Sequence, residues 1–213
     1  MSVDRPFGKA NTHKPDIKHY SPKLRAMVSC DSFLEKKKCL VIDLDNTVLS
    51  YMTQPDSTYF EFEGTVCRYT ADFIVRTENG YEFWELKPTA KTLSEKFKRR
   101  QAILELHFKN VLKVPLRVVT EVGLTKREFI SNCQLLSAFV NHYQDEDITQ
   151  RIISDLSEFS HPRVRDAELI ATNYGQSPDY VWAMLANKTL KFNHDLLLDR
   201  ATQIDMEASD HAF

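Results

Sequence analysis

The chain has 213 residues, of which 42% are hydrophobic and 27% charged, and its formal net charge is −2. This length fits one sizeable domain with an appendage or two small domains, and the composition excludes a disordered or fibrous protein. No apolar run approaches the roughly 20 residues of a membrane span, and residues 1–19 lack the hydrophobic stretch of a signal peptide, so we expect a cytoplasmic protein with no membrane partner.

The first half of the chain predicts a helix followed by strands. A helix is expected over residues 29–45, because Asp31 or Ser32 can cap it and its apolar positions lack strand alternation. The clearest local signal is a β-hairpin around the turn-forming residues 77–80. The predicted strands cover residues 48–52, 59–62, 67–76 and 81–86.

The second half predicts mainly helices. A long helix over residues 90–108 follows Pro88, which ends the preceding strand, and a last strand covers residues 116–120. Another helix is expected from Thr125 to about His142. The predicted core order is therefore helix, three strands, helix, strand and helix, in an α/β fold.

Residues 144–147 are acidic and mark the expected boundary between domain 1–143 and domain 144–213. The second domain resembles a small helical, winged-helix-like module. It is poor in Lys and Arg, so we expect it to bind a protein partner rather than to be the principal DNA binder. Its predicted helices cover residues 148–156 and 166–173 and start again at residue 178.

Charge is distributed unevenly along the chain. Residues 1–40 carry a balance of +5 and residues 86–144 one of +7, whereas residues 41–85 and 145–213 each carry −7. An acidic centre between basic segments suits a metal-dependent enzyme that acts on a polyanion, because Lys and Arg can hold phosphates around it. Ordinary solvent-exposed surfaces of a protein would give the same alternation of acidic and basic segments. Four widely spaced cysteines without a CxxC pair are expected to be reduced and mostly buried.

The hairpin brings acidic residues together. With Arg76 opposite Tyr81, Asp72 lies directly across from Glu85. Side chains alternate along a strand, so Glu85 and Lys87 share a face with Asp72. The same register places position 70 across from Lys87.

Two carboxylates at this distance repel each other unless a cation compensates them, and oxygen ligands of this kind suit Mg²⁺, with Mn²⁺ as a substitute. Lys87 would position or deprotonate a water and stabilise the pentacovalent phosphate. The alternative is an ordinary solvent-facing sheet edge, in which Lys87 forms a cross-strand ion pair. Upstream, Ser32-x-x-Glu35 reads by itself as a capping box, in which Glu35 bonds back to the helix start.

An upstream helical Glu, then Asp, then Glu-x-Lys on a hairpin resembles the PD-(D/E)xK restriction-endonuclease-like nucleases, whose core order is αβββαβ. Within them the chain is similar to the TnsA family, the endonuclease subunits of heteromeric bacterial transposases. Asp31 and Ala71 depart from the family's usual Glu and Pro. The phrases that carry the likeness are Tyr20-Ser21-Pro22-Lys23, Asp31-Ser32-Phe33-Leu34-Glu35, Val48-Leu49-Ser50-Tyr51 with Gln54-Pro55, Arg68-Tyr69-Thr70-Ala71-Asp72-Phe73 and Trp84-Glu85-Leu86-Lys87-Pro88.

This resemblance implies that Glu35, Asp72, Glu85 and Lys87 are catalytic and that the three acids bind Mg²⁺. It implies cleavage of the 5′ ends of a transposon in double-stranded DNA, a DDE-type partner, TnsB, that cuts the 3′ ends, and an ATPase regulator, TnsC. The basic residues expected to contact DNA are Lys23, Lys91, Lys96, Lys98, Arg99 and Arg100.

A competing motif reads Asp43-Leu44-Asp45-Asn46-Thr47, as in the DxDxT nucleophile of haloacid-dehalogenase-like phosphatases. That fold places the motif at the end of a central parallel strand and requires later acids that this chain lacks. Asp43 and Asp45 are therefore expected at the end of the first helix and in its turn. A DNA-binding adaptor with a decayed site would have lost an acid or the lysine, and all four are present.

Overall fold

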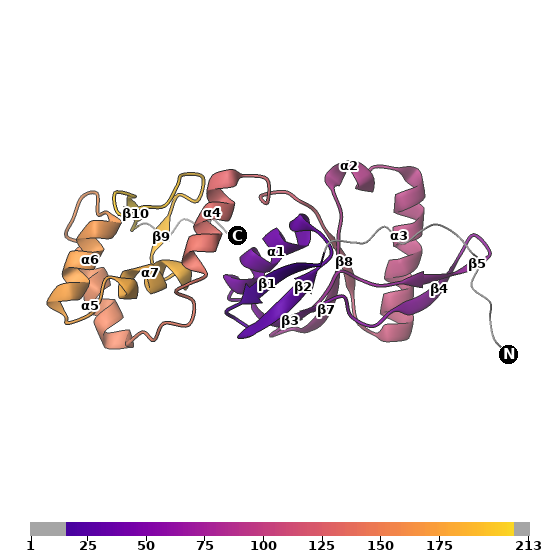
Figure 1. Cartoon of the computed structure of the whole chain (residues 1–213), viewed down its shortest axis with the longest axis horizontal. Helices are drawn as coiled ribbons and strands as arrows, with labels where there is room; N and C mark the ends of the chain where they lie inside the picture. The colour runs from indigo at the N-terminus through magenta and orange to yellow at the C-terminus, as the bar shows by residue number, and fades with distance from the viewer. Residues whose placement is uncertain (1–15, 207–213) are drawn as a thin grey trace.

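The computed structural model describes residues 16–206. They form an elongated mixed α/β molecule with a sheet in the middle and helices on both sides of it (Figure 1). The helices are α1 (Phe33–Asp43), α2 (Thr89–Thr92), α3 (Glu95–His107) with a π-helical extension η1 (Phe108–Leu112), α4 (Arg127–Leu136), α5 (Glu146–Leu156), α6 (Val164–Asn173) and α7 (Asp179–Ala186). The strands are β1 (Ile17–Ser21), β2 (Ala26–Cys30), β3 (Val48–Thr53), β4 (Thr58–Phe62), β5 (Thr65–Tyr69), β6 (Phe73–Thr77), β7 (Gly80–Leu86), β8 (Leu116–Val119), β9 (Lys191–Phe192) and β10 (Ile204–Asp205).

The central sheet has four strands in the order β3-β6-β7-β8. The first three are antiparallel neighbours, whereas β8 runs parallel to β7 after a crossover through α3. A parallel neighbour needs such a crossover because a short turn cannot return the chain to the same end of the sheet. The β1–β2 and β4–β5 hairpins are additional two-stranded ribbons outside this sheet. The expected α/β class is confirmed at this level.

One face of the sheet packs against α1. Phe73 and Val75 are fully buried there, and Trp84 shares their face because side chains alternate along a strand. They belong to one hydrophobic cluster with Cys39 and Ile42 of α1. Burying a side chain of this size contributes about 2 kcal/mol, so this face anchors α1 to the sheet.

The opposite face packs against α3 and the β4–β5 hairpin. Phe108 lies at the centre of this second cluster, with ring centroids 5.0 Å from Phe83 of β7 and 5.7 Å from Tyr69 of β5. Leu104, one turn earlier on α3, is fully buried in it. Glu85 follows Phe83 by two residues, so its side chain leaves β7 on this face.

The first predicted helix begins four residues later than expected. Ala26–Cys30 form strand β2, and Ser32 caps α1 by accepting the N–H of Glu35 at 3.1 Å. The five residues of β2 pair with β1 across a turn, with Tyr20 opposite Met27. This hairpin was not predicted, because residues 29–32 carry the local signals of a helix start.

Two other predicted elements are interrupted. The strand expected over residues 67–76 is two strands, because β5 pairs with β4 whereas β6 pairs with β3 and β7. The chain changes partner at residues 70–72, so the expected pairing of Thr70 with Lys87 is wrong: Thr70 instead bonds Ser57 through the two hydroxyls at 2.7 Å. The helix expected over residues 90–108 breaks before Ser94, which caps α3.

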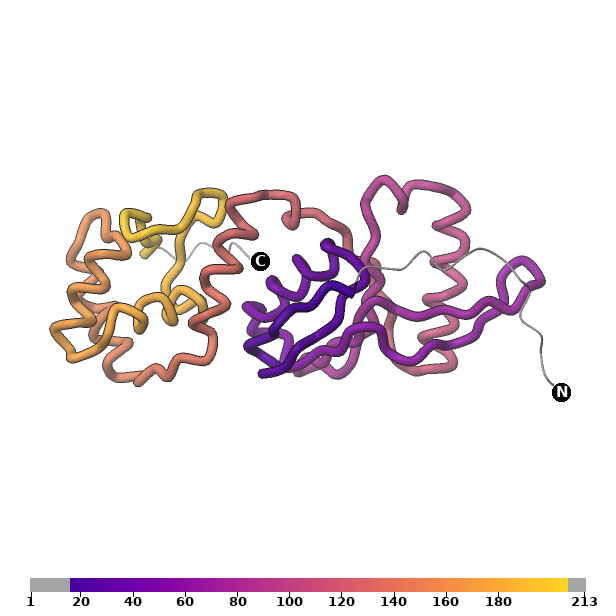
Figure 2. The backbone as a smooth tube through the Cα atoms, viewed as in Figure 1, coloured from indigo at the N-terminus to yellow at the C-terminus, as the bar shows by residue number. Residues whose placement is uncertain are grey.

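The C-terminal part contains α5, α6 and α7 close to the expected positions, followed by the antiparallel pair β9–β10. Figure 2 shows the connection from β8 passing over α1 to reach α4, the helix beside this part. Helix α4 packs against both α1 and α7, and one hydrophobic cluster extends from α1 through Leu136 to Ile152 and Met184. The boundary between residues 143 and 144 stays a prediction.

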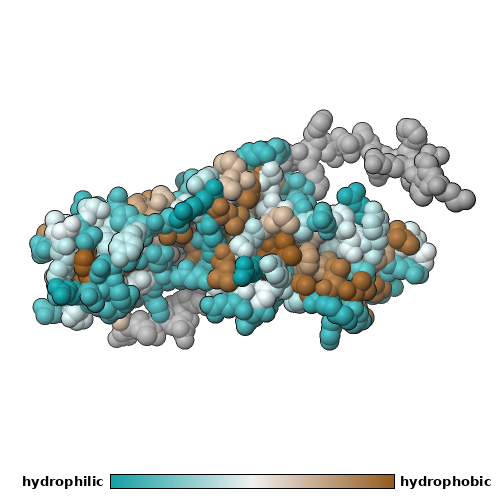
Figure 3. Space-filling view, turned by 90° about the horizontal axis from the view of Figure 1, so that it is seen from below, coloured by the Kyte–Doolittle hydropathy of each residue, from teal (hydrophilic) through white to brown (hydrophobic). Residues whose placement is uncertain are grey.

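Hydrophobic surface is concentrated over the sheet and α3 side of the molecule in the view from below, whereas the α5–α7 end is mainly hydrophilic there (Figure 3). In residues 16–206, no helix is long and apolar enough to cross a membrane.

Candidate active site

Asp72 and Glu85 lie at the same end of the central sheet, where β6 begins and β7 ends. The predicted register is confirmed, with Arg76 opposite Tyr81 and the last full pair at Phe73 and Trp84. Asp72 immediately precedes β6, and its N–H donates to the carbonyl oxygen of Trp84 at 3.1 Å. Its carboxylate then accepts the N–H of Leu86 through Oδ2 at 2.7 Å. The Asp72 carboxylate thus takes the place of the next main-chain acceptor in the hydrogen-bond ladder between β6 and β7.

Glu85 is almost fully buried, at 3% exposure, and both of its carboxylate oxygens have donors. The ammonium of Lys87 lies 2.6 Å from Oε1, and the hydroxyl of Tyr69 donates to Oε2 at 2.6 Å. Burial, and then the negative charge of Glu85, raise the pKa of Tyr69, so its hydroxyl stays protonated as a donor. Lys87 is thus placed beside the carboxylates, as expected from alternation along β7.

Glu35 approaches from α1 on the other side of the sheet end. It is 6% exposed, and its Oε2 and Oε1 accept from the Asp31 N–H and the Ser32 hydroxyl, both at 2.9 Å. Glu35 therefore bonds back to the helix start as predicted, although the main-chain N–H that it accepts is that of Asp31 and not of Ser32. Gln54, which follows β3, also donates its side-chain amide to Glu35 Oε2 at 3.3 Å.

The electrostatics of Asp72 show that the three acids act on one another. Burial, then the charge of Glu85 and, as the smallest contribution, the charge of Glu35 raise the pKa of Asp72, whose net value is about 6. The Leu86 N–H and Lys87 oppose this shift. Burial and the neighbouring carboxylates together make ionisation of Asp72 costly, and a bound cation would lower that cost.

The donor set agrees with a hard divalent cation. All three candidate ligands are carboxylates, which Mg²⁺ and Mn²⁺ prefer, and the repulsion between Asp72 and Glu85 would be relieved by such an ion. The distances between the possible ligands are longer than a bound ion requires: among the described residues, no three His, Cys, Asp or Glu side chains are close enough together to hold a metal ion. Glu85 would have to exchange its contact with Lys87 for the ion.

The phosphatase-like motif lies elsewhere and has a structural environment. Residues 41–43 are helical rather than a strand, and the Asp43 carboxylate accepts from the Ser21 hydroxyl at 2.5 Å and the Tyr51 hydroxyl at 3.2 Å. Its other oxygen lies 2.7 Å from Nε2 of His19. Asp45 forms a turn by accepting the Thr47 N–H at 3.0 Å. The expectation that both acids lie at the helix end is confirmed.

The basic residues expected to contact DNA fall into two groups. Lys23 is internal: its ammonium donates to the carbonyl oxygens of Asp45, at 2.6 Å, and Val48, at 2.5 Å, and burial lowers its pKa. These contacts make it a structural residue rather than a free DNA contact. The others lie on α2 and α3: Lys91 and Lys96 are exposed, Lys98 and Arg99 are also exposed but pair with Glu95 and Glu63, and Arg100 covers the rings of Phe60 and Tyr69.

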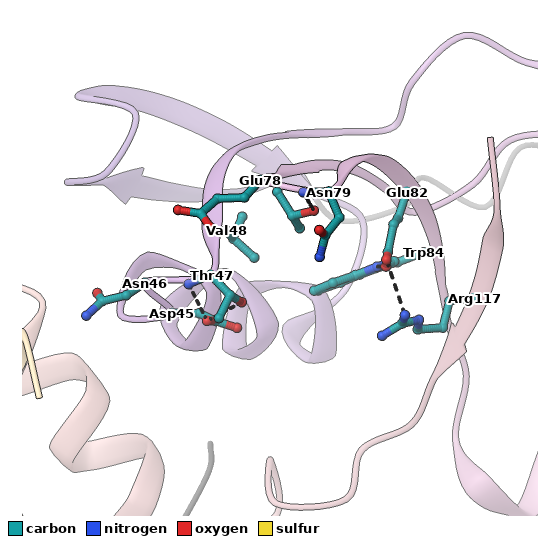
Figure 4. A pocket seen from close by; sticks show the side chains of 10 residues that line it. Asp45, Asn46, Thr47, Val48, Glu78, Asn79, Glu82, Trp84 and Arg117 are labelled. Carbon is teal, nitrogen blue, oxygen red and sulfur yellow. Dashed lines mark hydrogen bonds and ion pairs between the residues drawn. The ribbon is translucent and has the colours of Figure 1, made fainter.

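A shallow cavity of about 520 Å³ lies on the α1 face of the sheet, near the end of α1. Figure 4 shows Trp84 beside Asp45 and Thr47 on one side and the Glu82–Arg117 ion pair on the other. The cavity takes in the turn of the phosphatase-like motif but none of the four candidate catalytic residues. It is separate from the carboxylate site.

Two residues that hold the acids in place were not predicted from the sequence. Tyr69 and Gln54 both lie within the short phrases Arg68–Phe73 and Gln54-Pro55 quoted above, but neither was assigned a role. Their contacts to Glu85 and Glu35 depend on distant segments meeting, which a local pattern does not reveal.

No protein-family model matches the chain, and a search of curated proteins also finds no match.

Proposed function

We propose that the chain is a Mg²⁺-dependent DNA endonuclease, with Glu35, Asp72, Glu85 and Lys87 as its active site. The observation that carries the proposal is the convergence of Asp72 and Glu85, in which burial and the charge of Glu85 raise the pKa of Asp72, with Lys87 beside them. A site of this kind is costly to fold unless a cation or substrate compensates it.

The residues would divide the work as follows. Asp72, Glu85 and Glu35 hold the metal, which when bound supplies a positive charge that neutralises the scissile phosphate and acidifies a water. The side chain of Lys87 is 30% exposed, and its Nζ would orient the attacking water, accept its proton or stabilise the charge that develops on the phosphate. Tyr69 keeps Glu85 in place by donating to Oε2.

The element order supports a restriction-endonuclease-like core. Helix α1 precedes β3, β6 and β7, and α3 then leads to β8, which gives the αβββαβ order once the β4–β5 hairpin is treated as an insertion. Asp72 lies just before the second of these strands and Glu85 near the end of the third, in keeping with the resemblance to PD-(D/E)xK nucleases.

The resemblance to the TnsA family specifies the proposal further. The substrate would be the 5′ ends of a transposon in double-stranded DNA, cleaved during cut-and-paste transposition, with TnsB as the DDE-type partner and TnsC as the ATPase regulator. Exposed Lys91 and Lys96, with Lys98 and Arg99, would hold the DNA backbone beside α3. Lys23 is left out of this surface because its ammonium is used internally.

The three C-terminal helices and the β9–β10 pair support a winged-helix-like module. Helix α7, the third helix of the module and so the candidate recognition helix, is mostly buried: Val181, Ala183 and Met184 are 0% exposed, and Trp182 stacks on Phe139, just beyond α4. A helix packed in this way has no exposed face that could enter a DNA groove. This supports a protein-binding role for residues 144–213.

The test is nicking of double-stranded transposon-end DNA in Mg²⁺ or Mn²⁺, with and without the DDE-type partner subunit. Asp72→Asn and Lys87→Met are expected to lower the rate at least about a hundredfold, because each removes a charge that acts in the transition state. Asp56→Asn and Lys109→Met, which change exposed residues outside the site, are matched controls that should retain activity. Unchanged cleavage by either active-site variant would refute the assignment.

A further inference from the structure

Gln54 occupies an unusual backbone position between two of the candidate ligands. It follows the last residue of β3 and has a φ of 49°, in the left-handed region that non-glycine residues rarely adopt. Its N–H donates to the carbonyl oxygen of Asp72 at 2.9 Å, which continues the β3–β6 pairing by one step beyond Thr53 and Phe73. The main chain of Gln54 is thereby fixed to the segment that carries Asp72.

The side chain of Gln54 turns from this point to α1. Its Nε2 donates to Glu35 Oε2 at 3.3 Å, and the same carboxylate accepts the Asp31 N–H and the Ser32 hydroxyl. These three donors are neutral, so they orient the Glu35 carboxylate and leave its charge uncompensated. Glu85 differs, because Lys87 neutralises it at 2.6 Å. Asp31 and Ser32 belong to the start of α1, whereas Gln54 is the donor that comes from the sheet.

We propose that Gln54 is a positioning residue for the metal site: it links Glu35 on α1 to Asp72 on β6 and holds the helical carboxylate toward the other two. The inference rests on the proposed function. Neutral partners of ligating carboxylates commonly strengthen metal binding because they restrict the ligand without taking its charge. The left-handed backbone fits this role, since it directs a long amide away from the strand.

Mn²⁺ affinity of the full chain, measured by calorimetry and electron paramagnetic resonance without DNA, tests the inference. Gln54→Leu removes the amide at similar length, and Gln54→Asn keeps an amide and tolerates the left-handed backbone but is one methylene shorter. Both are expected to weaken Mn²⁺ binding about tenfold or more. Gln134→Leu, at an exposed position of α4, is the control and should bind normally. Circular dichroism checks that each variant is folded.

A double-substitution cycle separates positioning from a general structural effect. If Gln54 acts through Glu35, Gln54→Leu should cost affinity in the wild-type background and nothing further in Glu35→Gln. Equal losses in both backgrounds, or unchanged affinity in folded Gln54→Leu and Gln54→Asn, would overturn this inference and leave the proposed function standing. Absence of Mn²⁺ binding by the unsubstituted chain would overturn both.

Discussion

Asp43 and Asp72 are acids near the ends of core elements, but their surroundings differ. Asp43 is 1% exposed and lies against His19, Ser21 and Tyr51, each of which can serve as a hydrogen-bond donor. Asp72 has one main-chain donor, the Leu86 N–H, and lies near two carboxylates, whose effect on its pKa the charge of Lys87 only partly opposes. One acid completes a buried hydrogen-bond network, and the other lies among like charges.

The difference shows that burial by itself does not mark a functional acid. The motif around Asp43 is the more specific phrase in the sequence, yet its carboxylate is fully used in attaching the β1–β2 hairpin to α1. Asp72 belongs to a weaker pattern, but its pKa is raised to about 6 by burial and by Glu85. Charge that the fold leaves uncompensated is the better indicator of a site for a cation.

The comparison predicts opposite effects of the same chemical change at the two acids. Asp43→Asn should lower the free energy of unfolding by about 3 kcal/mol, because it leaves His19 and the two hydroxyls without their charged acceptor. Urea unfolding at pH 7 followed by circular dichroism measures it, with Asp56→Asn as an exposed control. A change within error of the control would mean that the network contributes nothing to stability.

Asp72→Asn should instead raise the free energy of unfolding at pH 7, by about 2 kcal/mol in metal-free buffer. The folded pKa of about 6 lies above the ordinary value of 3.8, so ionisation costs stability. The penalty is absent below about pH 4, grows as the pH rises and is complete above about pH 6. Unfolding of both proteins across this range tests it; a gain that is equal at pH 3.5 and pH 7 would show that ionisation of Asp72 is not its cause.

The smallest effect is expected for Lys23, which lies in the same region as Asp43. Lys23→Met should lower the free energy of unfolding by about 1.5 kcal/mol, because the carbonyl oxygens of Asp45 and Val48 lose a charged donor. The affinity of the Lys23→Met variant for DNA, measured by fluorescence anisotropy at two salt concentrations, should equal that of the unsubstituted chain. A weaker DNA complex with unchanged stability would return Lys23 to the DNA-binding surface.

Local patterns predicted a large part of the fold. The β6–β7 register could be predicted because the turn at residues 77–80 fixes it, and the start of α7 because Pro178 follows the turn at residues 175–177. The break at residues 70–72 was missed, since continuous β-forming residues do not reveal that the chain changes partner there. The β1–β2 hairpin was also missed, because its place depends on contacts with α1.

The candidate site could be predicted only in part for the same physical reason. Alternation along β7 placed Glu85 and Lys87 on one face, and the capping box at Glu35 follows from three-residue spacing. Tyr69 and Gln54 reach their acids from other strands, so no spacing in the sequence reveals them. Similarly, the role of Asp43 depends on residues 22 and 24 positions away.

Helix α4 belongs to two packing surfaces at once, one against α1 and one against α7. Leu136 is 1% exposed, and Phe139, just beyond α4, stacks on Trp182 at a centroid distance of 5.9 Å. A chain cut after residue 143 would therefore present these side chains to water and attract other exposed apolar surfaces. Shortened versions of this protein for crystallisation or assay should keep α7, or replace Leu136 and Phe139 with polar residues.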